Sequence, residues 1–191
     1  MLNVSLSEAE MAFYEALRRN ALDAIAAADD QSKRFAVLAQ LTKLRQAACH
    51  PRLAEADSRL GSSKLELVGD TILELLENGH KALIFSQFVK HLRIVEQWVK
   101  NQGISYQYLD GQTPGKKREA AVQAFQNGEG DVFLISLKAG GTGLNLTEAD
   151  YVLHLDPWWN PAVEDRASDR AHRIGQQRPV TVYRFVSEAT I

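Results

Sequence analysis

The chain has 191 residues, of which 45% are hydrophobic and 24% are charged, and this composition predicts a packed core. Its 22 basic and 24 acidic residues give a formal net charge of −2, which excludes a uniformly basic protein that coats nucleic acid but not a local basic groove. The one cysteine, Cys49, cannot form an internal disulfide, and Cys49-His50 lacks companions at zinc-ligand spacing, so Cys49 is interpreted as a half-buried residue at a helix end. No apolar run reaches the length of a membrane span and no signal-peptide pattern is present, so a reducing compartment is expected.

Residues 1–60 are predicted to form a helical segment. The sequence Ser5-Leu6-Ser7-Glu8 offers a capping box for the first helix. Apolar residues then recur every three or four positions in two stripes separated at 28–32, namely Tyr14, Leu17, Ala21 and Ile25, and then Val37, Leu41, Leu44 and Ala48. Pro51 ends the second stripe.

Gly61-Ser62-Ser63 marks the boundary between this segment and residues 61–191. Ser63 with Glu66 can cap a third helix, whose apolar stripe would be Leu65, Val68, Ile72 and Leu75. After Lys81, strands are expected at 82–85, 105–109, 132–135, 151–155 and 180–185, and helices around 92–99, 121–125 and 161–173. This alternation predicts an α/β domain with a parallel sheet covered by helices on both faces.

Four loops follow strands of the predicted sheet: Ser86-Gln87, Asp110-Gly111-Gln112-Thr113, 138–145 and 156–160. In parallel sheets of this kind, ligands bind beyond the carboxyl ends of the strands. The four loops are therefore expected to lie on one edge, and that edge is the predicted place of a ligand site.

The last predicted helix carries charges along one face. Asn160 and Pro161 suit its start and Gly175 suits its end. Between them, charged residues stand at i, i+3, i+4 and i+7: Arg166, Asp169, Arg170 and Arg173. One interpretation is a solvated face held by pairing of Asp169 with Arg173. The other is that Arg170 and Arg173 point at the phosphates of a nucleotide bound elsewhere, because a planar, permanently charged guanidinium matches phosphate oxygens.

The loop after strand 132–135 is rich in glycine. Gly140, Gly141 and Gly143 can adopt positive φ and let a phosphate or a nucleic-acid backbone come close, and Asn145 adds a side-chain amide. A tight turn from a strand into a helix would use the same glycines, so the loop alone is weak evidence. It gains weight because it is expected to share an edge with the arginine helix.

Two further features suit nucleic acid. Trp158-Trp159 can plug a core or contact a groove, and we expect one tryptophan in each role. Thr113, Lys116, Lys117 and Arg118 form a basic cluster at a helix start, which suits backbone phosphates as well as it suits a solvated helix end.

Some groups that a nucleotide-hydrolysing enzyme needs are missing from the sequence. No GxxxxGK motif followed by Ser or Thr occurs, no Asp-Glu pair follows an apolar strand to hold magnesium, and no metal site is predicted. The chain is therefore not expected to hydrolyse a nucleotide alone, and the arginines imply a partner lobe.

These motifs resemble those of the SWI/SNF-type ATPases, a family of superfamily-two helicases, over nearly the whole chain. The similar segments stand in the family's order: 82–88, 109–113 with Arg118, 136–146, 156–161 and 169–176. Leu6-Ser7-Glu8, Leu44-Arg45-Gln46 and His50-Pro51 also fit the family's linker. The resemblance implies that 61–191 is the second RecA-like lobe, truncated at its C-terminal end, and that 1–60 is the helical linker before it.

The resemblance implies an ATP-driven translocase on double-stranded DNA, which remodels protein–DNA complexes and does not separate the strands. ATP with Mg²⁺ would be held mainly by an absent first lobe of the same polypeptide. Arg170 and Arg173 would be catalytic, and nucleotide binding or its coupling to DNA would involve Gly141, Thr142, Gly143, Asn145, Asp169 and Gln176. The residues implied to face DNA are Ser86, Gln87, Gly111, Thr113, Arg118, Lys138, Gly140 and Trp159.

The chain departs from the family pattern at two places. Arg166 stands where the family usually has glutamine, and it could contact nucleotide or Asp169, so its role is left open. Family members continue beyond Ile191 into a helix that braces the lobes, so a fragment that is inactive alone is expected. The lack of insertions between motifs favours a compact prokaryotic member in the cytoplasm or nucleoid, whereas a eukaryotic member would be nuclear.

Two other functions compete with this interpretation. The first is the C-terminal lobe of an RNA helicase, but such enzymes tend to have arginine where this chain has Gln176, and the segment 156–161 also argues against it. The second is a non-enzymatic, doubly wound module that binds a nucleotide or a protein. In that case ATP hydrolysis would not respond to substitution of Arg170 or Arg173.

Overall fold

The structure, a computed structural model, describes residues 1–139, 146–156, 179–188 and 190. The chain divides into two compact units, residues 3–67 with 187–191, and residues 1–2 with 68–186. The predicted division into 1–60 and 61–191 stays a prediction. Among the described residues, no helix is both long enough and apolar enough to cross a membrane.

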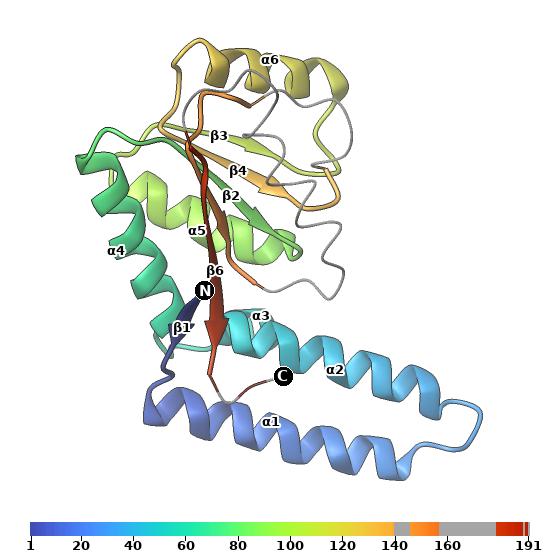
Figure 1. Cartoon of the computed structure of the whole chain (residues 1–191). Coiled ribbons are helices and arrows are strands. Elements are labelled where there is room, and N and C mark those ends of the chain that lie inside the picture. The colour runs from blue at the N-terminus through green and yellow to red at the C-terminus, as the bar shows by residue number, and fades with distance from the viewer. Residues whose placement is uncertain (140–145, 157–178, 189, 191) are drawn as a thin grey trace. The chain divides into compact units, whose positions relative to one another are not determined.

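The unit of residues 3–67 is built on an antiparallel pair of helices (Figure 1). Helix α1 spans Glu8–Ala27 and helix α2 spans Lys33–Cys49. The two predicted apolar stripes meet between them, where the buried residues are Tyr14, Leu17, Ala21, Leu44, Ala47 and Ala48. A short helix that was not predicted, α3 (Pro51–Ala54), follows with His50 as its N-cap. Cys49, expected to be half-buried, is fully buried as the last residue of α2.

The capping box of α1 lies two residues later than predicted. Its N-cap is Ser7, whose hydroxyl accepts the Glu10 N–H at 3.2 Å, and the Glu10 carboxylate accepts the Ser7 N–H at 3.2 Å. Ser5 instead donates to Glu188 at 3.1 Å. Both serine–glutamate spacings satisfy the local rule, but Glu10 also accepts the backbone N–H of Ser63 at 3.2 Å and the Ser63 hydroxyl. Of two capping boxes that the local sequence allows, the structure forms the one whose glutamate also binds a residue distant in sequence.

Helix α4 (Ser63–Glu77) is preceded by Ser62, which replaces the predicted cap Ser63. The Ser62 hydroxyl accepts the Leu65 N–H at 3.1 Å, whereas the Ser63 hydroxyl is used by Glu10. The predicted apolar stripe is confirmed: Val68, Ile72 and Leu75 are buried, and Leu65 is half-buried.

The unit of residues 68–186 is an α/β layer on a parallel sheet, as predicted. Strands occur at the expected places as β2 (Ala82–Ser86), β3 (Tyr106–Leu109), β4 (Val132–Ser136), β5 (Tyr151–His154) and β6 (Thr181–Ser187). The short strand β1 (Leu2–Val4) was not predicted, and the order within the described residues is β1-β6-β5-β2-β4-β3. The pairings from β6 through to β3 are all parallel.

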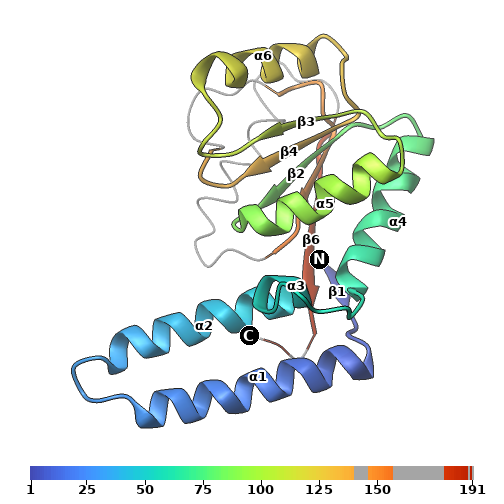
Figure 2. The same cartoon turned by 180° about the vertical axis from the view of Figure 1, so that it is seen from behind.

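Helices α5 (Val89–Asn101) and α6 (Gly115–Gln126) lie on opposite sides of the sheet (Figure 1, Figure 2). Strands β2 and β4 are buried at every residue, as expected for strands covered on both faces. Phe85, Phe133 and Ile135 pack in one cluster with Phe125 of α6. Alternate residues point to the opposite face, the side of α5, whose buried residues include Leu92, Val95 and Val99.

Candidate functional site

The carboxyl edge of the sheet brings together loops that follow neighbouring strands. The parallel register aligns Ser86 with Ser136, Phe85 with His154 and Leu109 with Ile135. Hydrogen bonding continues beyond the strands, since Leu137 N donates to Ser86 O at 3.0 Å and Leu155 N donates to Phe85 O at 2.9 Å. The prediction that these loops share an edge is confirmed for the described residues, which include Ser86, Gln87, Gly111, Thr113, Lys138 and, early in α6, Arg118.

A buried carboxylate, Asp156, joins the end of β5 to the end of β2. One of its oxygens accepts the Ser86 hydroxyl, and the other accepts the Gln87 N–H at 3.1 Å. His91, in the first turn of α5, places Nδ1 3.6 Å from Asp156 Oδ1, and both side chains are only 1% exposed. One carboxylate therefore fixes the turn from β2 into α5 and the point where the chain leaves β5.

The environment of Asp156 keeps it ionised. Burial by itself would raise the pKa of this carboxyl. The neighbouring His91 ring, the Ser86 hydroxyl and the Gln87 N–H together outweigh burial and hold the pKa of Asp156 below its usual value. A buried ion with several donors is costly to disturb, because removing one partner leaves the others unsatisfied.

Ser86, which was predicted to contact DNA, has a local structural role in the described conformation. Its side chain is fully buried, its hydroxyl donates to Asp156, and its oxygen accepts the Phe88 N–H at 3.0 Å. In the structure the Ser86 side chain therefore positions the turn from β2 into α5. Its contact with DNA stays a prediction.

The loop after β3 is a turn centred on Asp110. Its carboxylate accepts the Gln112 N–H at 2.9 Å and the Tyr108 hydroxyl at 2.7 Å. The Thr113 hydroxyl accepts the Asp110 N–H at 3.0 Å and lies 3.4 Å from the Asp110 carboxylate, so it serves the turn. Gly111 is exposed, and a Cβ at this position would meet no other atom within 4 Å. The turn thus presents bare backbone to solvent at Gly111.

A positive side chain supports this turn from α5. The Arg93 guanidinium lies 3.9 Å from the centre of the Tyr108 ring, donates to Glu96 at 3.0 Å, and lies 3.6 Å from the Asp110 carboxylate. Burial would raise the pKa of Asp110, but the Tyr108 hydroxyl, the Gln112 N–H and the Arg93 charge together lower it. Burial and the hydrogen bond to Asp110 raise the pKa of Tyr108 well above its usual value. The phenol therefore stays a neutral donor that orders the turn.

An open groove of about 780 Å³ lies beside β3 and α6. Its charged lining residues are of both signs: Arg93 and Lys117 are basic, and Asp110 and Glu129 are acidic. Such a mixed lining does not select a strongly charged ligand, and we assign none to the groove.

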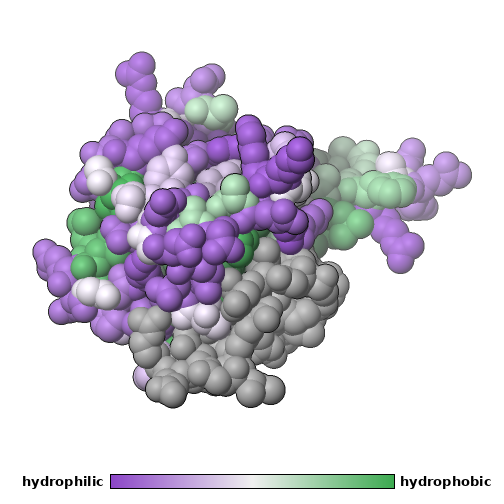
Figure 3. Space-filling view, turned by 90° about the horizontal axis from the view of Figure 1, so that it is seen from above, coloured by the Kyte–Doolittle hydropathy of each residue, from purple (hydrophilic) through white to green (hydrophobic). Residues whose placement is uncertain are grey.

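Exposed cations border the carboxyl edge. Lys138 follows β4 and is exposed, and the turn next to it is held by the Ser136 hydroxyl, which accepts the Ala139 N–H at 3.1 Å. The predicted basic cluster does lie at a helix start: α6 begins at Gly115, with Lys116 and Lys117 exposed and Arg118 half-buried. The described surface above α6 is mostly hydrophilic (Figure 3). Cations near a helix N-terminus form a surface that favours anions.

The predicted nucleotide-binding and catalytic residues lie outside the described residues, and so does the predicted helix 161–173. They are Gly141, Thr142, Gly143, Asn145, Asp169, Arg170, Arg173 and Gln176. The same holds for Gly140 and Trp159, expected to contact DNA, and for Arg166. Their roles stay predictions.

The sequence did not reveal the side-chain networks of this edge. Ser86 and Asp156 are separated by 70 positions, and no local pattern marks His91 or Arg93 as a partner of an aspartate. One available signal went unused: Ser86 and Asp156 both follow strands expected to be parallel, and such strands can lie next to each other.

Comparison with known proteins shows which family the chain belongs to. Residues 63–175 match the family described as the helicase conserved C-terminal domain. An uncharacterized ATP-dependent helicase of Mycoplasma pneumoniae is 39% identical over 189 residues, covering 98% of this chain and 18% of the relative. The putative ATP-dependent helicase/translocase YwqA of Bacillus subtilis is 36% identical over 194 residues, covering 98% of this chain and 21% of the relative. The chain thus spans about a fifth of the length of these relatives.

Two solved structures are similar to the chain over nearly its whole length. The Sulfolobus solfataricus SWI2/SNF2 ATPase C-terminal domain superposes with a TM-score of 0.81 at 30% identity, over 99% of this chain and 78% of that chain. The SWI2/SNF2 ATPase core of the same organism, in complex with dsDNA, gives 0.82 at 32% identity, over 97% of this chain and 40% of that chain. The predicted RecA-like architecture is confirmed. The chain belongs to the helicase conserved C-terminal domain family, as a C-terminal lobe of the SWI2/SNF2 type of superfamily-two ATPase.

Proposed function

We propose that the chain is the C-terminal motor lobe of an ATP-dependent translocase on double-stranded DNA, which remodels protein–DNA complexes. The observation that carries the proposal is the carboxyl edge, where bare backbone at Gly111, exposed Lys138 and the basic start of α6 follow neighbouring strands. Support comes from a structural neighbour of the same fold in complex with dsDNA, and from relatives named as a helicase/translocase and as a regulator of chromatin.

The proposed DNA contacts are of three physical kinds. Lys138 supplies a flexible point charge for a backbone phosphate. Gly111 lets the DNA backbone approach the peptide closely, because it has no side chain. Arg118 and the first N–H groups of α6 offer further donors for phosphate oxygens, and Gln87 lies where its loop leaves β2. Such contacts read the DNA backbone and carry little sequence information, as a translocase requires.

We propose that ATP with Mg²⁺ binds at a site that this chain shares with a first lobe of the same polypeptide. This chain would contribute Arg170 and Arg173 to the phosphates, while Gly141, Thr142, Gly143, Asn145, Asp169 and Gln176 would bind nucleotide or couple it to DNA. The support for these roles is the sequence resemblance. Asp156 adds a physical route for coupling, because it holds the loop after β2 and directly precedes the segment that carries both arginines.

ATP turnover by the intact parent protein tests the proposed substrate. Duplex DNA, single-stranded DNA and RNA are added separately at one salt concentration, because all such binding depends on salt. We expect strong stimulation by duplex DNA alone. Greater stimulation by RNA would support the RNA-helicase alternative, and no stimulation by any nucleic acid would remove DNA as the substrate.

Substitution of the arginines tests the enzymatic role. Arg170→Ala and Arg173→Ala in the intact protein are each expected to lower kcat by roughly a thousandfold, the scale of a lost arginine finger. Arg19→Ala is the matched control, since Arg19 lies on α1 with a side chain 77% exposed. Unchanged turnover in both variants would support the non-enzymatic module. The 191-residue chain alone is expected to show negligible turnover and weak, salt-sensitive DNA binding, which robust turnover would contradict.

A further inference from the structure

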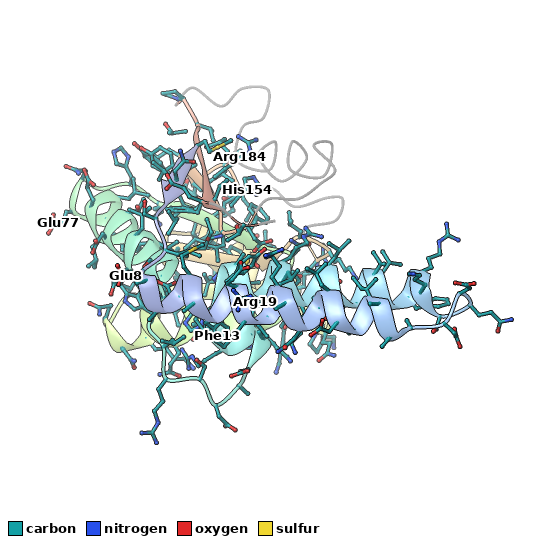
Figure 4. All side chains as sticks on the ribbon, turned by 90° about the horizontal axis from the view of Figure 1, so that it is seen from below. Glu8, Phe13, Arg19, Glu77, His154 and Arg184 are labelled. Carbon is teal, nitrogen blue, oxygen red and sulfur yellow. The ribbon has the colours of Figure 1, made fainter. Side chains whose placement is uncertain are left out.

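The helical hairpin α1–α2 carries four of the seven large hydrophobic residues that are exposed in the described part of the chain. Leu22 is 55% exposed, Phe35 73%, Leu38 58% and Leu41 38%. Single exposed apolar residues are normal on any protein, but these four belong to one short hairpin. Figure 4, which labels Arg19 on α1, shows this hairpin with its side chains.

Two of these residues, Leu22 and Leu41, line a pocket between the two helices. The pocket has a volume of about 210 Å³, and its apolar lining comes from both helices: Ala21, Leu22, Ile25, Val37, Leu41 and Leu44. Leu22 and Leu41 are both lining residues and exposed, so the pocket opens to the surface. Leu38 stands three positions before Leu41, and Phe35 stands three positions before Leu38, so both continue the apolar surface along α2. Leu22, Phe35, Leu38 and Leu41 are called the hairpin face below.

The rim of the hairpin face is basic. Helix α2 contains Lys33, Arg34, Lys43 and Arg45 and no acidic residue. Positions 34, 38, 41 and 45 follow at intervals of four, three and four, so an arginine stands at each end of the pair Leu38 and Leu41. Arg18 of α1 also lines the pocket. Residues 15–45 contain six basic and four acidic side chains, and one of the acids, Glu15, is bonded to Arg18 at 3.0 Å, so the excess of positive charge lies on α2.

We propose that the hairpin face binds an acidic amphipathic helix of a separate protein. Its apolar side chains would fill the pocket and cover Leu38 and Phe35, while its Asp and Glu residues would meet the basic rim. Two other occupants fit less well, and the cross-linking test below separates a third, a segment of the same polypeptide. A second copy of this chain would bring two basic rims together. Duplex DNA would satisfy the arginines but would leave the apolar side chains without a partner.

Peptide binding to the intact protein tests the chemistry of the face. The probe is a fluorescent synthetic helix with leucine at i, i+3, i+4 and i+7 and glutamate elsewhere, and its counterpart has lysine in place of every glutamate. Fluorescence anisotropy is expected to show at least roughly tenfold tighter binding of the glutamate peptide. The double variant Phe35→Ser with Leu38→Ser should weaken that binding roughly tenfold, whereas Leu73→Ser, at a leucine 38% exposed on α4, should not. Equal binding of both peptides, or no effect of the double variant, would overturn the proposal.

Folding does not confound this test, because the substituted side chains are largely exposed and their loss is expected to leave the unfolding midpoint unchanged. A photo-crosslinking residue at position 38 of the intact protein then identifies the occupant. Cross-links to a separate protein, in a segment with leucines spaced along a helix and flanked by acids, would support the proposal. Cross-links only to the same polypeptide or to a second copy, or loss of duplex DNA binding in the double variant, would overturn it.

Discussion

The two ends of strand β5 carry the same combination of groups. Before the strand, Asp150 accepts the Lys81 N–H at 3.1 Å and lies 2.6 Å from His80 Nδ1. After the strand, Asp156 accepts the Gln87 N–H at 3.1 Å and lies 3.6 Å from His91 Nδ1. In each case an aspartate that flanks β5 binds a backbone N–H that flanks β2, beside a histidine.

Asp150 with His80 is called the amino-end clamp below, and Asp156 with His91 the carboxyl-end clamp. The two clamps differ in their exposure to water. At the amino end the side chains of His80 and Asp150 are 36% and 12% exposed, whereas at the carboxyl end those of His91 and Asp156 are 1% exposed each. Water can replace a lost partner at the amino end but not at the carboxyl end, so the same residue types should contribute very different free energies. The buried clamp also lies on the edge that gathers the candidate site. An aspartate thus links β5 to β2 at both ends of the strand, and only the buried one, Asp156, orders the candidate site.

Alanine substitution of the two aspartates should give the largest contrast. Asp156→Ala leaves the Ser86 hydroxyl, the Gln87 N–H and His91 without their buried acceptor, and we expect a loss of about 3 kcal/mol in the free energy of unfolding. Asp150→Ala should cost about 1 kcal/mol or less, because its partners are partly solvated. Urea unfolding of both variants measures this difference. Equal losses would mean that exposure does not distinguish the clamps.

Acid should reveal the charge of the buried clamp. The folded-state pKa of Asp156 lies below the usual value of 3.8, so its stabilising contribution is fully present above that value and is lost as the pH falls through the folded-state pKa. Asp156→Asn cannot titrate at this position. We therefore expect the free energy of unfolding to fall more steeply in the wild type than in Asp156→Asn as the pH falls below 3.8 towards the folded-state pKa. Parallel curves would show that the carboxylate is not the source of the acid sensitivity.

Glycines extend the contrast between the two edges to the backbone. Gly130, just before β4 at the amino edge, has φ of 116°, and a Cβ there would meet Gln107 Cγ at 3.4 Å. Gly130→Ala is therefore expected to cost about 1–2 kcal/mol of stability. At the carboxyl edge, a Cβ on Gly111 would meet nothing within 4 Å, so Gly111→Ala should change stability by less than about 0.5 kcal/mol. Thermal unfolding of the two variants provides the measurement.

Gly111 then becomes a probe for DNA, because the fold does not need a glycine at this exposed turn. Gly111→Val in the intact protein should weaken duplex binding while leaving the unfolding midpoint unchanged, if DNA comes close to this backbone. Unchanged duplex affinity would remove the turn after β3 from the proposed contact surface.

The parallel sheet was predictable from sequence because its strands contain continuous apolar runs, such as residues 132–135, separated by helical patterns. The shared edge followed from the rule that parallel strands present their carboxyl ends together. The three-residue strand Leu2–Val4 was missed because so short a segment has no periodicity to detect.

Some side-chain partners could not be predicted because contacts between residues distant in sequence determine them. Ser5 and Ser7 each precede a glutamate at capping-box spacing, and the structure uses the pair whose glutamate also binds Ser63, 53 positions away. The family resemblance placed Ser86 against DNA, and the structure adds that its hydroxyl donates to Asp156, 70 positions away. Local patterns place a residue at an edge of the fold, whereas the partner of its side chain depends on tertiary packing.

Substitution of one exposed lysine at either edge should have the smallest effect on stability, and it tests most directly where DNA binds. Lys138 lies at the carboxyl edge, and Lys100 lies in the last turn of α5, which runs back towards the amino edge. Both side chains are on exposed residues, so alanine at either position should change stability by less than about 0.5 kcal/mol. Lys138→Ala in the intact protein should weaken duplex binding and lower the slope of log Kd against log salt by about 1, the signature of one lost phosphate contact. Lys100→Ala should leave the slope unchanged. Equal slopes for both variants would place the DNA away from the carboxyl edge, and the observation that carries the proposed function would no longer support it.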